Sequence, residues 1–174
     1  MRYLKTALSI LLIIIFSYYL IFPEQLLLLN NLNFLIHEAG HLITSPLGEF
    51  ISVLGGTLFQ LAIPSLFVGY FFQKKDYYAG SVLLFWLAQN IMNVSIYMSD
   101  ALDMKLQLFG GENVVHDWNY ILEKLNLLFY TDILAGITKT LSVVLTGVAS
   151  FLTLKFSVGE KEDPIHQNTN SVLK

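Results

Sequence analysis

The chain of 174 residues contains no cysteine and few charged residues. Without thiols it can form neither a disulfide nor a thiolate nucleophile, and any metal site must use His, Asp, Glu or water. Charged residues make up 13% of the sequence, well below the quarter or so of a typical soluble domain. The net charge is -3 and no basic patch occurs, so the sequence predicts no nucleic-acid partner.

Hydrophobic residues are what the chain has in quantity. They make up 55% of it, and the mean hydropathy is +0.59. Each membrane crossing needs roughly 20 mostly apolar residues, so the length suits one all-α, polytopic bundle of about five to six spans. We expect residues 1–156 to form this membrane domain and the polar residues 157–174 to form a disordered tail.

The hydrophobic runs place the expected spans at residues 6–22, 25–45, 50–73, 79–99 and 133–155. The first has the basic start of a secretory signal but no small-residue cleavage site, which predicts an uncleaved span. Gly55-Gly56 and Pro64 interrupt the third, which predicts a kinked or re-entrant segment. Apolar residues at helical spacing from Trp118 to Phe129 predict an amphipathic helix at the interface or capping the bundle.

The second expected span contains the motif H-E-x-x-H, in the letters "HEAGH" at residues 37–41. Residues four apart share one face of a helix, so His37 and His41 can bind one metal ion with Glu38 beside them. In soluble proteases with this motif the histidines hold zinc, and the glutamate takes a proton from the attacking water. The motif therefore predicts a zinc site in a hydrophobic helix.

The rest of that helix continues the polar face. Five polar residues follow one another at spacings of 3, 4, 4 and 3: Asn30, Asn33, His37, His41 and Thr44. Because the remaining circumference is apolar, this stripe must face the inside of the bundle. Ala39 and Gly40 would let a neighbouring helix approach closely. A second polar stripe, Gln89, Asn93 and Asp100, lies on a later span and is the predicted partner.

A catalytic zinc site normally has three protein ligands, so a third must join the two histidines. The candidates are Asp100, Asp103, His116 and Asp117. If the two polar stripes face each other, Asp100 reaches the metal. His116 is the main rival, with Asp117 as its partner or as a helix cap. The alternatives are an interfacial helix end for Asp100 and a loop or cap role for the other two.

The letters "FLIHEAGHLI" within a span, together with an Asn and an Asp in a later span (Asn93 and Asp100), form a recognisable combination. It resembles the site-2-protease class of intramembrane zinc metallopeptidases, the M50 peptidases. From about residue 30 to 122 the sequence is similar to small bacterial M50-like membrane proteins. The resemblance implies that His37, His41 and Asp100 bind Zn²⁺, that Glu38 is catalytic, and that the protein lies in a bacterial inner membrane.

These observations lead to the expectation of an integral-membrane zinc metallopeptidase, with Glu38 as the general base. Its partners would be the lipid bilayer and a transmembrane protein substrate, cleaved within or next to the membrane. The alternative is a non-catalytic metal-binding membrane protein, such as an assembly factor or a degenerate protease-like partner. The sequence departs from the family pattern at Ile96, where the family usually has proline, and around Asp100.

Overall fold

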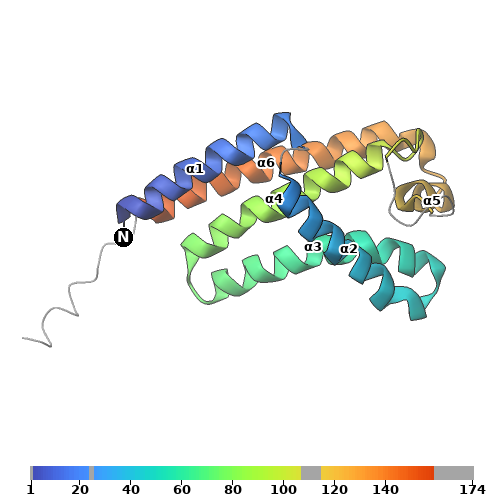
Figure 1. Ribbon diagram of the computed structural model, residues 1–174, viewed down its shortest axis with the longest axis horizontal. Coiled ribbons are helices and arrows are strands. Elements are labelled where there is room, and N and C mark those ends of the chain that lie inside the picture. The colour runs from blue at the N-terminus through green and yellow to red at the C-terminus, as the bar shows by residue number, and fades with distance from the viewer. Residues whose placement is uncertain (1, 24–25, 107–114, 159–174) are drawn as a thin grey trace, which may run out of the picture.

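The computed structural model describes residues 2–23, 26–106 and 115–158, and this part of the chain is all-α (Figure 1). The long elements are α1 (Arg2–Ile21), α2 (Leu27–Thr44), α3 (Glu49–Gln73), α4 (Tyr77–Ser99) and α6 (Thr131–Val158). Shorter ones are η2 (Ser45–Leu47), α5 (Asp117–Lys124) and η3 (Leu128–Tyr130). The all-α prediction is confirmed.

Within the residues that the structure describes, four helical segments are long and apolar enough to cross a membrane. They comprise α1, α3, α4 and the stretch Leu128–Val158, which joins η3 to α6. Helix α2 is not among them, although residues 25–45 were expected to span. Its 18 residues include three Asn and two His residues and Glu38, which lower its hydropathy. Multi-pass membrane insertion is thus plausible with four spans, fewer than the five to six predicted.

Helix α4 lies at the centre of the molecule and packs against α6, α3 and α1. Figure 1 shows α1, α4 and α6 running alongside one another. Two polar contacts join α4 to α6: Ser142 Oγ donates to the Ala88 carbonyl at 2.7 Å, and Ser95 Oγ donates to the Ala135 carbonyl at 2.8 Å. Such contacts and close van der Waals packing hold helices together where lipid replaces water.

Helix α3 is continuous over 25 residues, so Gly55, Gly56 and Pro64 do not divide it into a re-entrant segment. All three are buried. Next to the proline, Ser65 Oγ donates to the Leu61 carbonyl at 2.7 Å, which adds a hydrogen bond where the helix loses a backbone donor. The glycines serve a different purpose from a helix break, because they face α2.

Helix α2 packs chiefly on α3 and lies across it in Figure 1. The two backbones meet at Gly40 and Gly55, where a Cβ added to Gly40 would overlap the Gly55 carbonyl. The predicted close approach is therefore confirmed at Gly40, whereas Ala39 is exposed. Only helices with small residues at the contact can pack this tightly.

Helix α5 closes one end of the bundle, where Figure 1 places it beside the end of α4 and the start of α6. It contacts α3 and α4, buries Ile121 and Leu122, and exposes Glu123 and Lys124. The predicted amphipathic helix thus caps the bundle but ends earlier than expected. Helix α6 continues to Val158, and the rest of the expected disordered tail, residues 159–174, lies outside the described residues.

The glycine contact between α2 and α3 gives a test of the fold. Gly55→Ala adds a Cβ that would overlap Thr44 Oγ1 and lie 2.8 Å from the Gly40 carbonyl oxygen. We expect it to lower the free energy of unfolding by about 1–3 kcal/mol, the usual cost of overpacking. Gly69→Ala on the same helix is the matched control, since nothing lies within 4 Å of its added Cβ. Thermal unfolding in detergent measures both, and equal melting temperatures would contradict the predicted helix contact.

Candidate metal centre

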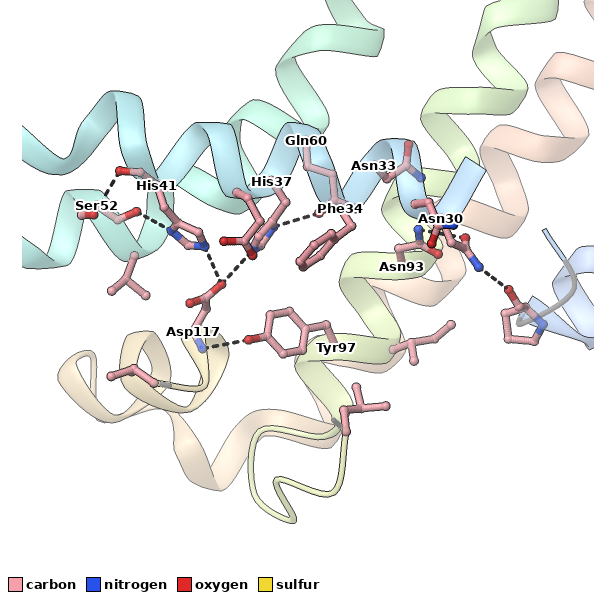
Figure 2. Close-up of a pocket in the computed structure, with 17 residues that line it drawn as sticks. Asn30, Asn33, Phe34, His37, His41, Ser52, Gln60, Asn93, Tyr97 and Asp117 are labelled. Atoms are coloured by element: carbon pink, nitrogen blue, oxygen red, sulfur yellow. Dashed lines mark hydrogen bonds and ion pairs between the residues drawn. The ribbon is translucent and has the colours of Figure 1, made fainter. Parts of the chain in front are cut away.

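Three metal-ligating side chains converge between α2 and α5 (Figure 2). Nε2 of His37 lies 2.7 Å from Asp117 Oδ2, and Nε2 of His41 lies 3.2 Å from the same oxygen. The three ligand atoms are all within 4.8 Å of one another. The cluster joins a predicted pair on one helix to a residue 80 positions away in the sequence.

The outer nitrogen of each imidazole has its own partner on α3. Nδ1 of His41 lies 2.8 Å from the Ser52 carbonyl oxygen, and Nδ1 of His37 lies 3.1 Å from Gln60 Oε1. Oxygens of this kind only accept, so each Nδ1 carries the hydrogen and donates. In a neutral ring Nε2 then presents its lone pair toward Asp117. This is the arrangement that orients histidines as metal ligands.

The ionised carboxylate of Asp117 places a negative charge in the cluster, which a positive charge must balance. Two Nε2 atoms face a carboxylate, and Asp117 is only 7% exposed. Burial opposes ionisation of Asp117, but hydrogen bonds and charge from His37 and His41 outweigh it and lower the pKa of the carboxyl below its usual value. Protons on the rings or a bound cation must offset the resulting negative charge.

The donor set suits zinc, which binds imidazole nitrogen and carboxylate oxygen and commonly takes three protein ligands in catalytic sites. The cluster borders a cavity of about 710 Å³. Asn31, Phe34, Glu38 and Tyr97 also line that cavity. The cluster is therefore accessible from this cavity.

Glycine at position 56 creates the space for this cluster. A Cβ added there would lie 2.6 Å from the Nε2 atoms of both His37 and His41. One face of α3 carries three residues at intervals of four, Ser52, Gly56 and Gln60. This face supplies the Ser52 carbonyl, the space left by the missing side chain of Gly56, and the Gln60 amide. The sequence analysis interpreted Gly55-Gly56 as an interruption of the span and did not predict this face, although the four-residue interval is visible in the sequence.

Asp117, one of the four sequence candidates, lies with His37 and His41 in the cluster that could hold a metal ion, and Asp100 is not part of that cluster. Asp100 ends α4, where its carboxylate accepts the Lys105 and Leu106 backbone N–H groups at 3.0 and 2.9 Å. Its Oδ2 also lies 3.4 Å from His116 Nε2. The two stripes diverge beyond Asn93 because α2 crosses α4 at a steep angle, as Figure 2 shows, so Asp100 sits away from His37 and His41.

The other two candidates have structural contacts. Asp103 is exposed and pairs with Lys105, at 2.6 Å between Oδ2 and Nζ. His116 is buried and caps α5, since its Nδ1 accepts the Asn119 backbone N–H at 3.2 Å. The expectation of a capping residue at this point was correct, but His116 provides the cap and Asp117 follows it.

The prediction that the two polar stripes face each other is confirmed in the first half of α2, at Asn30 and Asn33. Asn33 Nδ2 donates to Gln89 Oε1 at 2.5 Å, and Gln89 Nε2 donates to Asn30 Oδ1 at 2.6 Å. Asn93 Nδ2 also donates to Asn30, at 3.3 Å. Asn33 and Gln89 are buried and Asn30 and Asn93 are half-buried, so these amides satisfy one another and fix the position of α2 relative to α4.

Glu38 lies beside His37 on α2, is exposed, and lines the same cavity. A group with this position can exchange protons with water in the cavity. Tyr97 was not among the residues considered at the sequence level, although Gln89, Asn93 and Tyr97 follow at intervals of four on α4. Its ring centroid lies 6.0 Å from that of His37.

The choice between Asp117 and Asp100 can be tested by zinc content. We expect Asp117→Ala, like His37→Ala and His41→Ala, to lower zinc affinity by more than about 100-fold, because even losing a partner behind a ligand costs about 10–100-fold. Asp100→Ala should keep one zinc per chain. Elemental analysis of detergent-purified protein and competition with a chelator measure this, and zinc that survives loss of Asp117 but not of Asp100 would overturn the ligand set.

Gly56→Ala tests the space beside the two imidazoles. Its Cβ would lie within 2.6 Å of both Nε2 atoms, so we expect zinc affinity to fall by at least about tenfold. Gly69→Ala, whose Cβ meets nothing within 4 Å, should bind zinc like the wild type. Normal zinc binding by a folded Gly56→Ala protein would show that the metal does not occupy this position.

Comparisons with family models, curated protein sequences and solved structures find no match to this chain. The functional assignment therefore depends on the geometry and chemistry of this cluster.

Proposed function

We propose that the protein is an integral-membrane zinc metallopeptidase that hydrolyses a peptide bond of a transmembrane protein within or next to the bilayer. The observation that carries the proposal is the convergence of His37, His41 and Asp117 beside a cavity that Glu38 lines. Each histidine also has an acceptor behind it. A non-functional polar cluster would need neither this orientation nor an accessible carboxylate next to it.

The surroundings of the cluster support a membrane setting. Four helical segments have the length and hydropathy of membrane spans, and their outward faces are rich in exposed apolar residues. On α6 these include Ile133, Ile137, Leu141, Val144 and Phe151. Ionisable groups within such a bundle are costly and usually mark a functional site.

Zinc, when bound, would lower the pKa of a water molecule and polarise the carbonyl group of the substrate. Glu38 is placed to accept a proton from the attacking water, whose oxygen then bonds to the carbonyl carbon. When the C–N bond breaks, the same carboxyl group returns the proton to the leaving nitrogen. Asp117 and the two imidazoles would hold the metal, and each imidazole is oriented by its partner on α3.

The substrate must enter as an unwound segment, because helical backbone carbonyls are hydrogen-bonded and shielded by side chains. The cavity has polar groups that can receive such a segment. Asn31 and Glu38 are seven residues apart on one exposed face of α2, and both line the cavity. The Asn31 amide can both donate to and accept from a peptide backbone.

Glu38→Gln separates catalysis from metal binding. We expect this variant to keep one zinc per chain and to lose at least about 100-fold in cleavage rate, because an amide cannot accept the proton. Wild-type and variant proteins are each incubated in proteoliposomes with extracted membrane proteins, and new N-termini are identified by mass spectrometry. Glu49→Gln is the matched control, because Glu49 is an exposed glutamate at the start of α3 and does not line the cavity.

New N-termini should appear with the wild type and with Glu49→Gln, disappear after 1,10-phenanthroline treatment, and return when zinc is added. If Glu38→Gln generated the same termini as the wild type, Glu38 would not be the general base. If the wild type bound zinc yet generated none, the alternative of a non-catalytic metal-binding membrane protein would replace the proposal.

A further inference from the structure

Tyr97 is a polar side chain at the metal centre that the proposed mechanism does not yet use. It lies on α4, one turn beyond Asn93, and lines the same cavity as the metal ligands. Its ring stands edge-on to His37, with centroids 6.0 Å apart, and lies 4.4 Å from the ring of His116. These contacts on two sides hold the ring in one place, and Figure 2 shows the phenol directed toward Asp117.

The hydroxyl group of Tyr97 acts as an acceptor in its observed hydrogen bond. Its oxygen accepts the backbone N–H of Asp117 at 3.1 Å. A phenol can accept and donate at once, so the O–H hydrogen remains to be donated. Among the hydrogen bonds of residues 2–23, 26–106 and 115–158, none has the Tyr97 hydroxyl as donor.

The hydroxyl is connected to the cluster through Asp117. Its oxygen accepts a hydrogen bond from the backbone N–H of Asp117, whose carboxylate contacts both histidines. The Tyr97 side chain and the three clustered residues line the same cavity. The polar side chains on the opposite side of the histidines are already engaged: Gln60 with His37, and Ser52 Oγ with the His41 carbonyl at 3.2 Å.

We propose that Tyr97 donates a hydrogen bond from its O–H to the oxygen of a carbonyl group bound at the metal centre. This inference rests on the proposed function, under which that carbonyl belongs to the scissile peptide bond. Negative charge develops on this oxygen as water attacks, and a fixed donor stabilises it more than it stabilises the uncharged carbonyl. The proton stays on Tyr97, so the residue is an electrostatic catalyst and not a general acid.

The test uses Tyr97→Phe, which keeps the ring and removes the hydroxyl. Purified protein is loaded with Co²⁺, whose visible spectrum reports the ligands, and is titrated with acetohydroxamic acid, a small carbonyl compound that binds such metals. We expect Tyr97→Phe to keep one cobalt per chain with the wild-type spectrum. Its acetohydroxamate affinity should fall about tenfold, the effect of losing one hydrogen bond to a charged group.

Two further variants distinguish a hydrogen bond donated by Tyr97 to the bound carbonyl from a role of Tyr97 in holding α5 in position. Tyr70→Phe makes the same change at an exposed α3 residue that does not line the cavity, and it should bind acetohydroxamate like the wild type. Asn119→Ala removes another tie between α5 and α4, the hydrogen bond from Nδ2 to the Ala101 carbonyl at 2.8 Å. It should weaken cobalt binding without changing acetohydroxamate affinity at saturating cobalt.

Equal acetohydroxamate affinities for the wild type and Tyr97→Phe would overturn the inference. So would a Tyr97→Phe protein that loses cobalt in the manner of Asn119→Ala, because Tyr97 would then only position Asp117. On a peptide that the wild type cleaves, Tyr97→Phe should lower kcat by about 100-fold with little change in KM. A wild type without peptidase activity would refute the proposed function, while the cobalt titration would still decide whether Tyr97 is a donor.

Discussion

The close crossing of α2 and α3 is the contact on which the candidate metal centre depends. The two backbones touch at Gly40 and Gly55, and Gly56 leaves the adjacent space next to both imidazoles open. Because the helices are this close, α3 can place the Ser52 carbonyl and the Gln60 amide directly behind the histidines. A larger residue at the crossing would separate the rings from their acceptors, and free imidazoles would no longer be held as a pair.

The third ligand depends on a different constraint, the attachment of the short helix α5 to the end of α4. Tyr97 accepts the Asp117 backbone N–H, and Asn119 donates to the Ala101 carbonyl. Asp100 and His116 approach each other at the same place, with 3.4 Å between their facing atoms. Asp100 thus helps to hold the segment that carries His116 and Asp117 at the end of α4, which is a structural role for its carboxylate.

The bundle also shows how a polar stripe is accommodated among apolar helices. An unsatisfied polar group away from water costs free energy, and here the amides of Asn30, Asn33, Gln89 and Asn93 bond to one another between α2 and α4. This network occupies one end of the stripe, and the histidines occupy the other. Both parts line the cavity, so the same stripe that joins the helices also supplies the histidines of the candidate metal centre.

Local spacing by itself determined the helical character of the chain, the pairing of His37 with His41, the position of Glu38 beside them and the inward direction of the polar stripe. These features follow from 3.6 residues per turn and from the cost of exposing polar groups to lipid. Only the tertiary structure placed Asp117, and not Asp100, beside the two histidines, and only it brought Tyr97 and Gly56 to the same place. The angle between α2 and α4 and the return path of the chain after α4 set these contacts, and both arise from packing between segments far apart in the sequence.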